Sequence, residues 1–115
     1  MYQFPYADVL ENSPKLARER ERQVFECCLE LLKAADEKGP GSREGIEALA
    51  YCRRIWATLI EDLGSPENAF PKPLRAELIS IGLWVIRESE DIRLGKSANF
   101  KPLIEVTTAL YEGLK

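Results

Sequence analysis

The chain has 115 residues, a length typical of one domain rather than two. With 16 Lys and Arg against 19 Asp and Glu, its formal net charge is -3, and 45% of its residues are hydrophobic, a balance that is typical of soluble globular proteins and gives no general attraction to nucleic acid or anionic lipid. The absence of histidine excludes a Ser-His-Asp triad, imidazole metal ligands and a side chain whose unperturbed pKa lies near neutrality.

The segment before the first predicted helix contains three aromatic residues, Tyr2, Phe4 and Tyr6. It lacks the basic start and apolar stretch of a signal peptide, and the longest mainly apolar stretch of the chain, residues 78–86, is shorter than the roughly 20 residues of a membrane-spanning helix. We therefore expect a cytoplasmic protein without membrane insertion. The three aromatics either pack back over the domain or form a binding edge, since rigid aromatic side chains contribute strongly to interfaces.

A first helix is predicted from Ser13-Pro14 to Gly39-Pro40-Gly41. A serine N-cap followed by proline is typical of a helix start, because proline has a suitable fixed φ and no N–H to leave unpaired. Apolar residues recur every three or four positions, which predicts one buried stripe. The stripe consists of Val24, Phe25, Cys28, Leu31, Leu32 and Ala35.

The cysteines, Cys27, Cys28 and Cys52, are odd in number and have no C-x-x-C spacing. Adjacent side chains on a helix diverge by about 100°, so a bridge between Cys27 and Cys28 would strain the helix. We expect small buried residues in a reducing compartment rather than a disulfide framework.

A second helix is predicted from the N-cap candidate Ser42 to Leu63, with Gly64 where a left-handed residue commonly ends a helix. Its expected apolar stripe is Ile46, Leu49, Cys52, Trp56, Leu59, Ile60 and Leu63. A fourth helix follows Ser97-Ala98-Asn99, with Pro102 in its first turn. Its apolar side carries Leu103, Ile104, Val106, Thr107, Leu110, Tyr111 and Leu114.

The third predicted helix, from near Pro73 to Leu94, has apolar residues around most of its circumference: Leu78, Ile79, Ile81, Leu83, Trp84, Val85 and Ile86. It is either the central helix of a bundle or a helix that buries one side and offers the other to a partner. Gly82 within it costs about 1 kcal/mol of helix propensity relative to alanine, which indicates close approach by a neighbouring backbone.

Short loops and the lack of alternating strand-like runs predict one all-α domain, residues 1–115, built as a small bundle of four main helices, mostly antiparallel. No phosphate-binding glycine motif or carboxylate–histidine metal motif is present. We therefore expect no enzyme activity, no cofactor and no metal site. The cations Arg53, Arg54, Lys72 and Arg75 are few and diluted by acids, so direct nucleic-acid binding is not favoured.

The whole chain resembles the FlaF family of flagellar biosynthesis regulators. The resemblance rests on Met1-Tyr2-Gln3-Phe4 with Tyr6, Ser42-Arg43-Glu44, Leu59-Ile60-Glu61-Asp62-Leu63 continuing through Ser65-Pro66-Glu67-Asn68, residues 74–85, Leu103-Ile104-Glu105 and the ending Glu112-Gly113-Leu114. It implies a cytoplasmic, non-enzymatic factor for flagellin production and export that engages flagellin and acts against or alongside an FlbT-type regulator. It contributes no catalytic residues.

We expect an amphipathic segment of flagellin to dock in a groove or on a helix face of this protein. The candidate partner-binding residues are Tyr2, Phe4 and Tyr6 together with Ile79, Leu83 and Ile86 on the third helix. One alternative is control of flagellin mRNA, directly through the region of Arg53, Arg54, Lys72 and Arg75 or through an FlbT-type regulator. Another is a structural adaptor or homodimer that pairs through the third helix.

Overall fold

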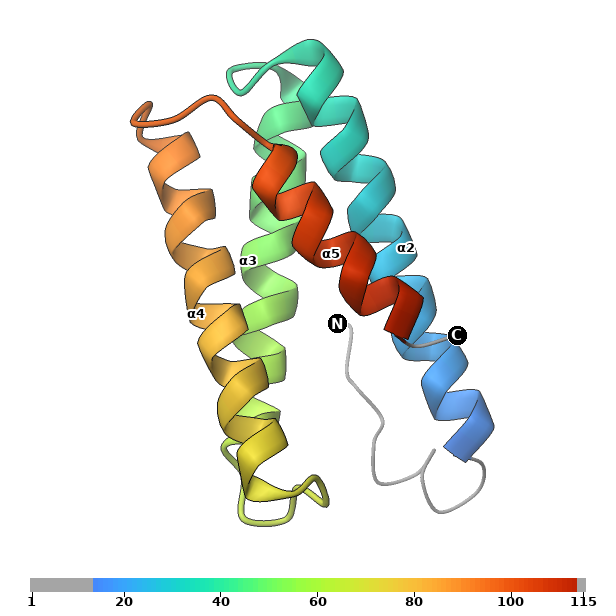
Figure 1. Cartoon of the computed structure of the whole chain (residues 1–115). Helices are drawn as coiled ribbons and strands as arrows, with labels where there is room; N and C mark the ends of the chain where they lie inside the picture. The colour runs from blue at the N-terminus through green and yellow to red at the C-terminus, as the bar shows by residue number, and fades with distance from the viewer. Residues whose placement is uncertain (1–13, 114–115) are drawn as a thin grey trace.

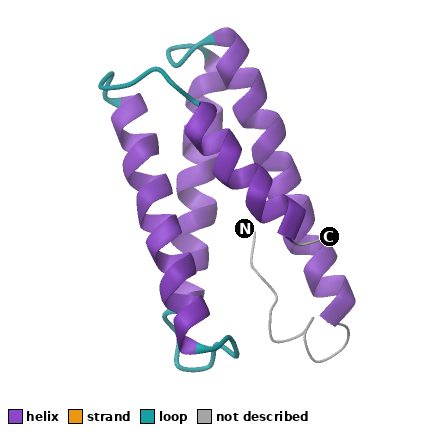
Figure 2. Cartoon of the chain, viewed as in Figure 1, coloured by secondary structure: helices purple, strands orange, loops and turns teal. Residues whose placement is uncertain are grey.

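The computed structural model describes residues 14–113, which form helices joined by loops (Figure 1). The helices are α2 (Pro14–Lys38), α3 (Arg43–Leu63), α4 (Lys72–Arg93) and α5 (Lys101–Gly113). Within the described residues there is no strand (Figure 2). The prediction of an all-α bundle of four main helices is confirmed. The helix bounds expected from the sequence agree with those of the structure within about two residues.

Helix α3 lies in the middle of the bundle, because it packs against both α2 and α4, while α5 packs chiefly on α2. Figure 1 shows α2, α3 and α4 side by side, with α5 crossing in front and its C-terminal end lying beside α2, away from α4. The alternative in which the third helix is central is therefore wrong, since α4 lies at the edge. None of the described helices combines the length and apolar character needed to cross a bilayer.

The core forms where α2, α3, α4 and α5 meet. It contains Cys28, Leu32 and Ala35 from α2, Ala48, Cys52, Ile55 and Trp56 from α3, Val85 and Ile92 from α4, and Phe100 and Leu103 at the start of α5. The expected stripe of the second helix is wrong at Ile46, which is 62% exposed, whereas Ile55 is buried. Ile46 follows the buried Gly45, which faces the carbonyls of Gly39 and Pro40, and one residue turns Ile46 about 100° around the helix from that contact.

The expectation for the cysteines is confirmed at Cys28 and Cys52, which are buried, and wrong at Cys27, which is exposed. The Sγ atoms of Cys28 and Cys52 lie 3.0 Å apart, at the contact between α2 and α3. Cys27 is turned about 100° from Cys28 and therefore cannot share this contact.

Within residues 14–113 the helix ends follow the sequence signals except at Gly64, and the predicted N-cap Ser13 lies outside these residues. The Ser42 hydroxyl accepts a hydrogen bond from the N–H of Gly45 (3.0 Å), which confirms the N-cap of α3. Gly39 and Gly95 have φ values of 99° and 81°, in the left-handed region that glycine adopts without steric cost. The left-handed conformation expected at Gly64 is wrong, because its φ is -82° and its N–H donates to the Ile60 carbonyl (3.0 Å).

At Gly82, side chains of α3 lie close to the backbone of α4. A Cβ placed on Gly82 would lie 2.6 Å from Cε3 of Trp56 and 2.9 Å from Cδ1 of Ile60. The predicted close approach by a neighbouring backbone is therefore wrong in its partner, because the nearest atoms belong to the side chains of Trp56 and Ile60. The absence of a side chain at Gly82 lets the bulky Trp56 ring lie between the two helices.

Candidate binding groove

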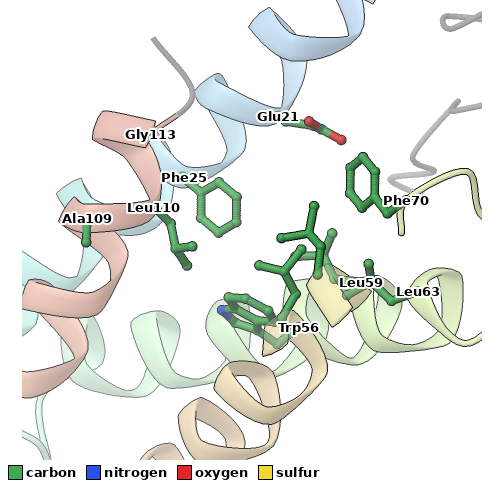
Figure 3. Close-up of a pocket in the computed structure, with 11 residues that line it drawn as sticks. Glu21, Phe25, Trp56, Leu59, Leu63, Phe70, Ala109, Leu110 and Gly113 are labelled. Carbon is green, nitrogen blue, oxygen red and sulfur yellow. The ribbon is translucent and has the colours of Figure 1, made fainter. Parts of the chain in front are cut away.

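An apolar groove of about 320 Å³ opens between α4 and α5 at the end of the bundle where these helices diverge (Figure 3). Its lining comes from all four described helices and from the loop before α4. The lining residues are Glu21 and Phe25, then Trp56, Leu59 and Leu63, then Phe70, Leu74 and Leu78, and finally Ala109, Leu110 and Gly113. The size lies at the lower end of the roughly 300–1,000 Å³ typical of binding pockets.

The floor of the groove is rigid. Trp56 and Phe25 are only 2% and 7% exposed, and their ring centroids lie 6.0 Å apart with the planes tilted by 54°, within the range of favourable aromatic pairs. Figure 3 shows Phe25 and Leu110 projecting into the groove from α2 and α5, with Trp56 below them. A floor packed in this way offers an apolar surface that is already formed.

The rim of the groove carries large apolar side chains in contact with solvent. Phe70 is 39% exposed and Leu74 is 40% exposed. Hydrogen bonds of the loop hold Phe70 in place. The N–H of Phe70 donates to Oδ1 of Asn68 (2.9 Å). Nδ2 of Asn68 in turn donates to the backbone carbonyl (3.2 Å) and to Oδ2 (3.1 Å) of Asp62. Burial raises the pKa of the Asp62 carboxyl, and the hydrogen bond from Asn68 partly opposes this rise.

Arg75 fastens the start of α4 to the end of α3. Its Nη1 donates to the carbonyl of Leu63 (3.4 Å), which lacks an intrahelical partner at the C-terminus of α3. It also donates to the carbonyl of Ser65 (3.2 Å) in the turn that follows. These bonds tie the turn after α3 to the start of α4. They also fix the rim next to Leu74, so that the apolar lining keeps its shape.

The predicted cationic region is partly engaged within the protein. Arg75 is bound to backbone carbonyls, and Nε of Arg53 lies 3.9 Å from Oε1 of Glu90. Glu90 also pairs with Arg93, and the hydrogen bond from Arg93 lowers the pKa of the Glu90 carboxyl. Two of the four cations considered for RNA binding thus have partners in the fold.

The predicted docking residues on the third helix lie on one side of α4 but outside the groove lining. Leu83 is 51% exposed, while Ile79 and Ile86 are half-buried. Leu83 follows the groove residue Leu78 by five positions, or about 140° around the helix, so the two leucines face different directions. The α4 stripe, defined as Ile79, Leu83 and Ile86, is therefore a separate surface. Tyr2, Phe4 and Tyr6 lie outside the described residues.

Sequence reasoning missed the groove. Leu74 and Leu78 are spaced by four residues, and Phe70 precedes them in a proline-containing loop. This spacing is typical of one helix face, and it was the available signal. The complete lining depends on how far apart α4 and α5 lie, which no local pattern contains.

The lining of the groove is almost entirely apolar. Among its lining residues, Glu21 alone carries an ionisable side chain. In the described part of the chain, no group of three or more Cys, Asp or Glu side chains is arranged to hold a metal ion. The arrangement offers burial of apolar side chains against a rigid aromatic floor.

Comparison with known proteins identifies one family. The family model described as "Flagellar protein FlaF" matches residues 2–114, which is nearly the whole chain. No curated protein and no solved structure matches the chain.

Proposed function

Because this chain belongs to the FlaF family of flagellar proteins, we propose that it is a cytoplasmic regulator of flagellum biogenesis that binds flagellin before export. It acts as an export chaperone without enzyme activity, and it promotes flagellin synthesis and secretion. The observation that carries this proposal is the apolar groove with its exposed rim. Unexported flagellin has amphipathic segments that a groove of this kind shields from water.

The docking mode follows from the shape and chemistry of the groove. An amphipathic segment places its apolar side chains on the Trp56 and Phe25 floor and covers Phe70 and Leu74 at the rim. Centrally buried aromatic and aliphatic anchors contribute most of the binding free energy of such interfaces. A floor that is already rigid adds to affinity, because little conformational entropy is lost on binding.

Titration calorimetry of the full chain with its own flagellin tests this proposal, with light scattering to give the stoichiometry. We expect a 1:1 complex of micromolar affinity or tighter. Leu74→Glu places a charge on the rim and should weaken binding at least tenfold, which corresponds to about 1.4 kcal/mol. Leu83→Glu is the matched control, because Leu83 is also an exposed leucine of α4 but lies outside the groove lining, and it should change the affinity less than twofold.

The opposite pattern would favour the α4 stripe with Tyr2, Phe4 and Tyr6 as the docking surface, as the sequence predicts. No complex with the wild-type chain would contradict flagellin binding. Circular dichroism must show unchanged helicity in both variants, so that unfolding is not mistaken for lost binding.

Control of flagellin mRNA, directly or through an FlbT-type regulator, and a homodimeric adaptor stay alternatives from the sequence. The exposed Leu83 on α4 is compatible with a dimer, whereas the engagement of Arg53 and Arg75 within the fold weakens the case for direct RNA binding. Loss of RNA binding with rising salt would identify the RNA alternative, and light scattering of the chain alone would identify a dimer.

A further inference from the structure

In the sequence, the start of α2 is only a few residues away from a residue that lines the apolar groove. Helix α2 begins at Pro14, and Glu21 seven residues later lines the groove. Seven residues of helix rise by about 10 Å. Residues 7–13 can span up to about 23 Å when extended, so residues 2–6 can reach back over this distance to the groove.

The sequence of residues 2–6 matches the chemistry of the groove. Tyr2, Phe4 and Tyr6 alternate with Gln3 and Pro5, and a residue before proline prefers an extended conformation. Alternate side chains of an extended segment point to the same side, so three aromatic rings can face one surface. The groove presents an apolar floor and an exposed rim to such a surface.

The short connection favours contact within one molecule. A segment tethered by a short linker has an effective concentration on the order of millimolar at a site within its reach. Each aromatic side chain can bury roughly 150–250 Å², and Phe70 and Leu74 at the rim add apolar area that is otherwise in water. Even a weak intrinsic affinity therefore suffices to fill the groove for most of the time.

We propose that residues 2–6 of this chain bind in its own apolar groove when no partner is present, and that they compete with an incoming partner for it. Occupation of the groove by the segment stands independently of the proposed function, whereas competition with flagellin rests on it. If the groove is free in about a tenth of the molecules, the apparent dissociation constant of a partner is raised about tenfold.

The test uses the full chain carrying Tyr2→Ser, Phe4→Ser and Tyr6→Ser together, with the fluorescent dye anilinonaphthalene sulfonate as a probe of open apolar surface. We expect several-fold more dye fluorescence than for the wild type, and adding Leu74→Glu to the triple variant should abolish this gain. Gln3→Ser with Asn12→Ser is the control, because it changes two polar residues among residues 1–13 and keeps the three aromatics; it should leave the fluorescence unchanged. Equal fluorescence of the triple variant and the wild type would overturn the proposal.

A synthetic peptide of residues 1–13 provides a second measurement that does not depend on the dye. The peptide should shift the Trp56 indole and Leu110 methyl resonances of the triple variant, and at least fivefold less peptide should be bound by the wild type. Equal binding to both chains would overturn occupation of the groove by the chain's own segment. A wild-type dimer that the triple mutation dissociates would also overturn it, because the segment would then occupy a second copy.

Flagellin titration separates the two proposals. The triple variant should bind flagellin about tenfold more tightly than the wild type, since the competitor is gone. Weaker binding would overturn competition and assign the aromatics to the partner interface. If neither chain binds flagellin while the dye and peptide results hold, the proposed function fails and the occupation of the groove stands.

Discussion

At the residue scale, Gly82 sets the distance between α4 and α3. A Cβ there would meet Cε3 of Trp56 at 2.6 Å and Cδ1 of Ile60 at 2.9 Å. The end of the Ile60 side chain can rotate away, but the Trp56 ring is buried against Phe25 and has little room to move. Relief of the contact must therefore displace the floor of the groove or separate the helices.

We expect Gly82→Ala to lower the free energy of unfolding by up to about 2 kcal/mol. Overpacking a core costs about 1–3 kcal/mol, and the gain of about 1 kcal/mol in helix propensity offsets part of it. Urea denaturation measures the difference. Gly41→Ala is the control, because nothing lies within 4 Å of a Cβ at Gly41. A Gly82→Ala variant more stable than the wild type would show that α4 does not approach α3 so closely.

The cysteines should differ sharply in reactivity. Cys27 is exposed, whereas Cys28 and Cys52 are buried with their Sγ atoms 3.0 Å apart. The hydrogen bond with Cys28 and burial raise the pKa of the Cys52 thiol, and thiols react as thiolates. Ellman's reagent should therefore label one thiol of the native protein rapidly, and Cys27→Ser should remove that phase. A second rapid phase in the native protein would contradict the burial of the pair.

At the element scale, the loop between α3 and α4 forms part of the groove as well as a connection. Asn68 bonds to Asp62 at the end of α3 and to the N–H of Phe70, while Arg75 at the start of α4 bonds back to the carbonyl of Leu63. The polar side chains of Asn68, Asp62 and Arg75 thus hold the loop that carries Phe70 at the rim. Side chains thus satisfy carbonyls at the end of α3, which would otherwise bond to solvent.

Two carboxyls at helix ends should give opposite pH dependences. Burial raises the pKa of Asp62, so its contribution to stability is largest when it is protonated and falls as the pH rises through the folded-state pKa. The hydrogen bond from Arg93 lowers the pKa of Glu90, so its contribution is present above the unfolded-state pKa and is lost as the pH falls. Thermal unfolding between about pH 3 and 7 tests both signs relative to the wild type.

In that series, the melting temperature of Asp62→Asn should rise more steeply with pH than that of the wild type. The reason is that the variant lacks a carboxyl whose contribution to stability falls as the pH rises. Glu90→Gln should make the rise shallower. Parallel curves for the two variants would contradict the assignment of the two shifts.

The elements themselves could be predicted because their signals are local. Ser13-Pro14, Ser42 and the glycines at 39 and 95 mark helix ends within a few residues of the chain. Errors arose where a neighbour in space decides the outcome. Ile46 is left exposed by its neighbours, and Gly64 keeps a φ of -82° where Arg75 bonds to the adjacent carbonyls of Leu63 and Ser65. The four-residue spacing of Leu74 and Leu78 was visible, but their opening toward α5 was not.

At the scale of the whole molecule, the groove exists because α4 and α5 pack on different helices. Helix α4 packs against α3, and α5 packs against α2. Helices α4 and α5 therefore diverge toward the end of the bundle that carries Phe70 and Leu110 (Figure 1). The same divergence leaves Trp56 and Phe25 as a shared floor. The apolar excess of α4 is thus used on two surfaces, since Leu74 and Leu78 line the groove and Leu83 faces elsewhere.

Filling the groove from α5 should block it without disturbing the core. Ala109 is exposed and lines the groove, so Ala109→Trp places an indole over the floor while helicity stays unchanged. We expect flagellin affinity to fall at least tenfold, because the filled groove no longer accepts an apolar anchor. The control is Ala50→Trp, at an exposed alanine of α3 that does not line the groove. Unchanged affinity in Ala109→Trp, measured by calorimetry, would place the flagellin site on another surface, with the α4 stripe as the next to test.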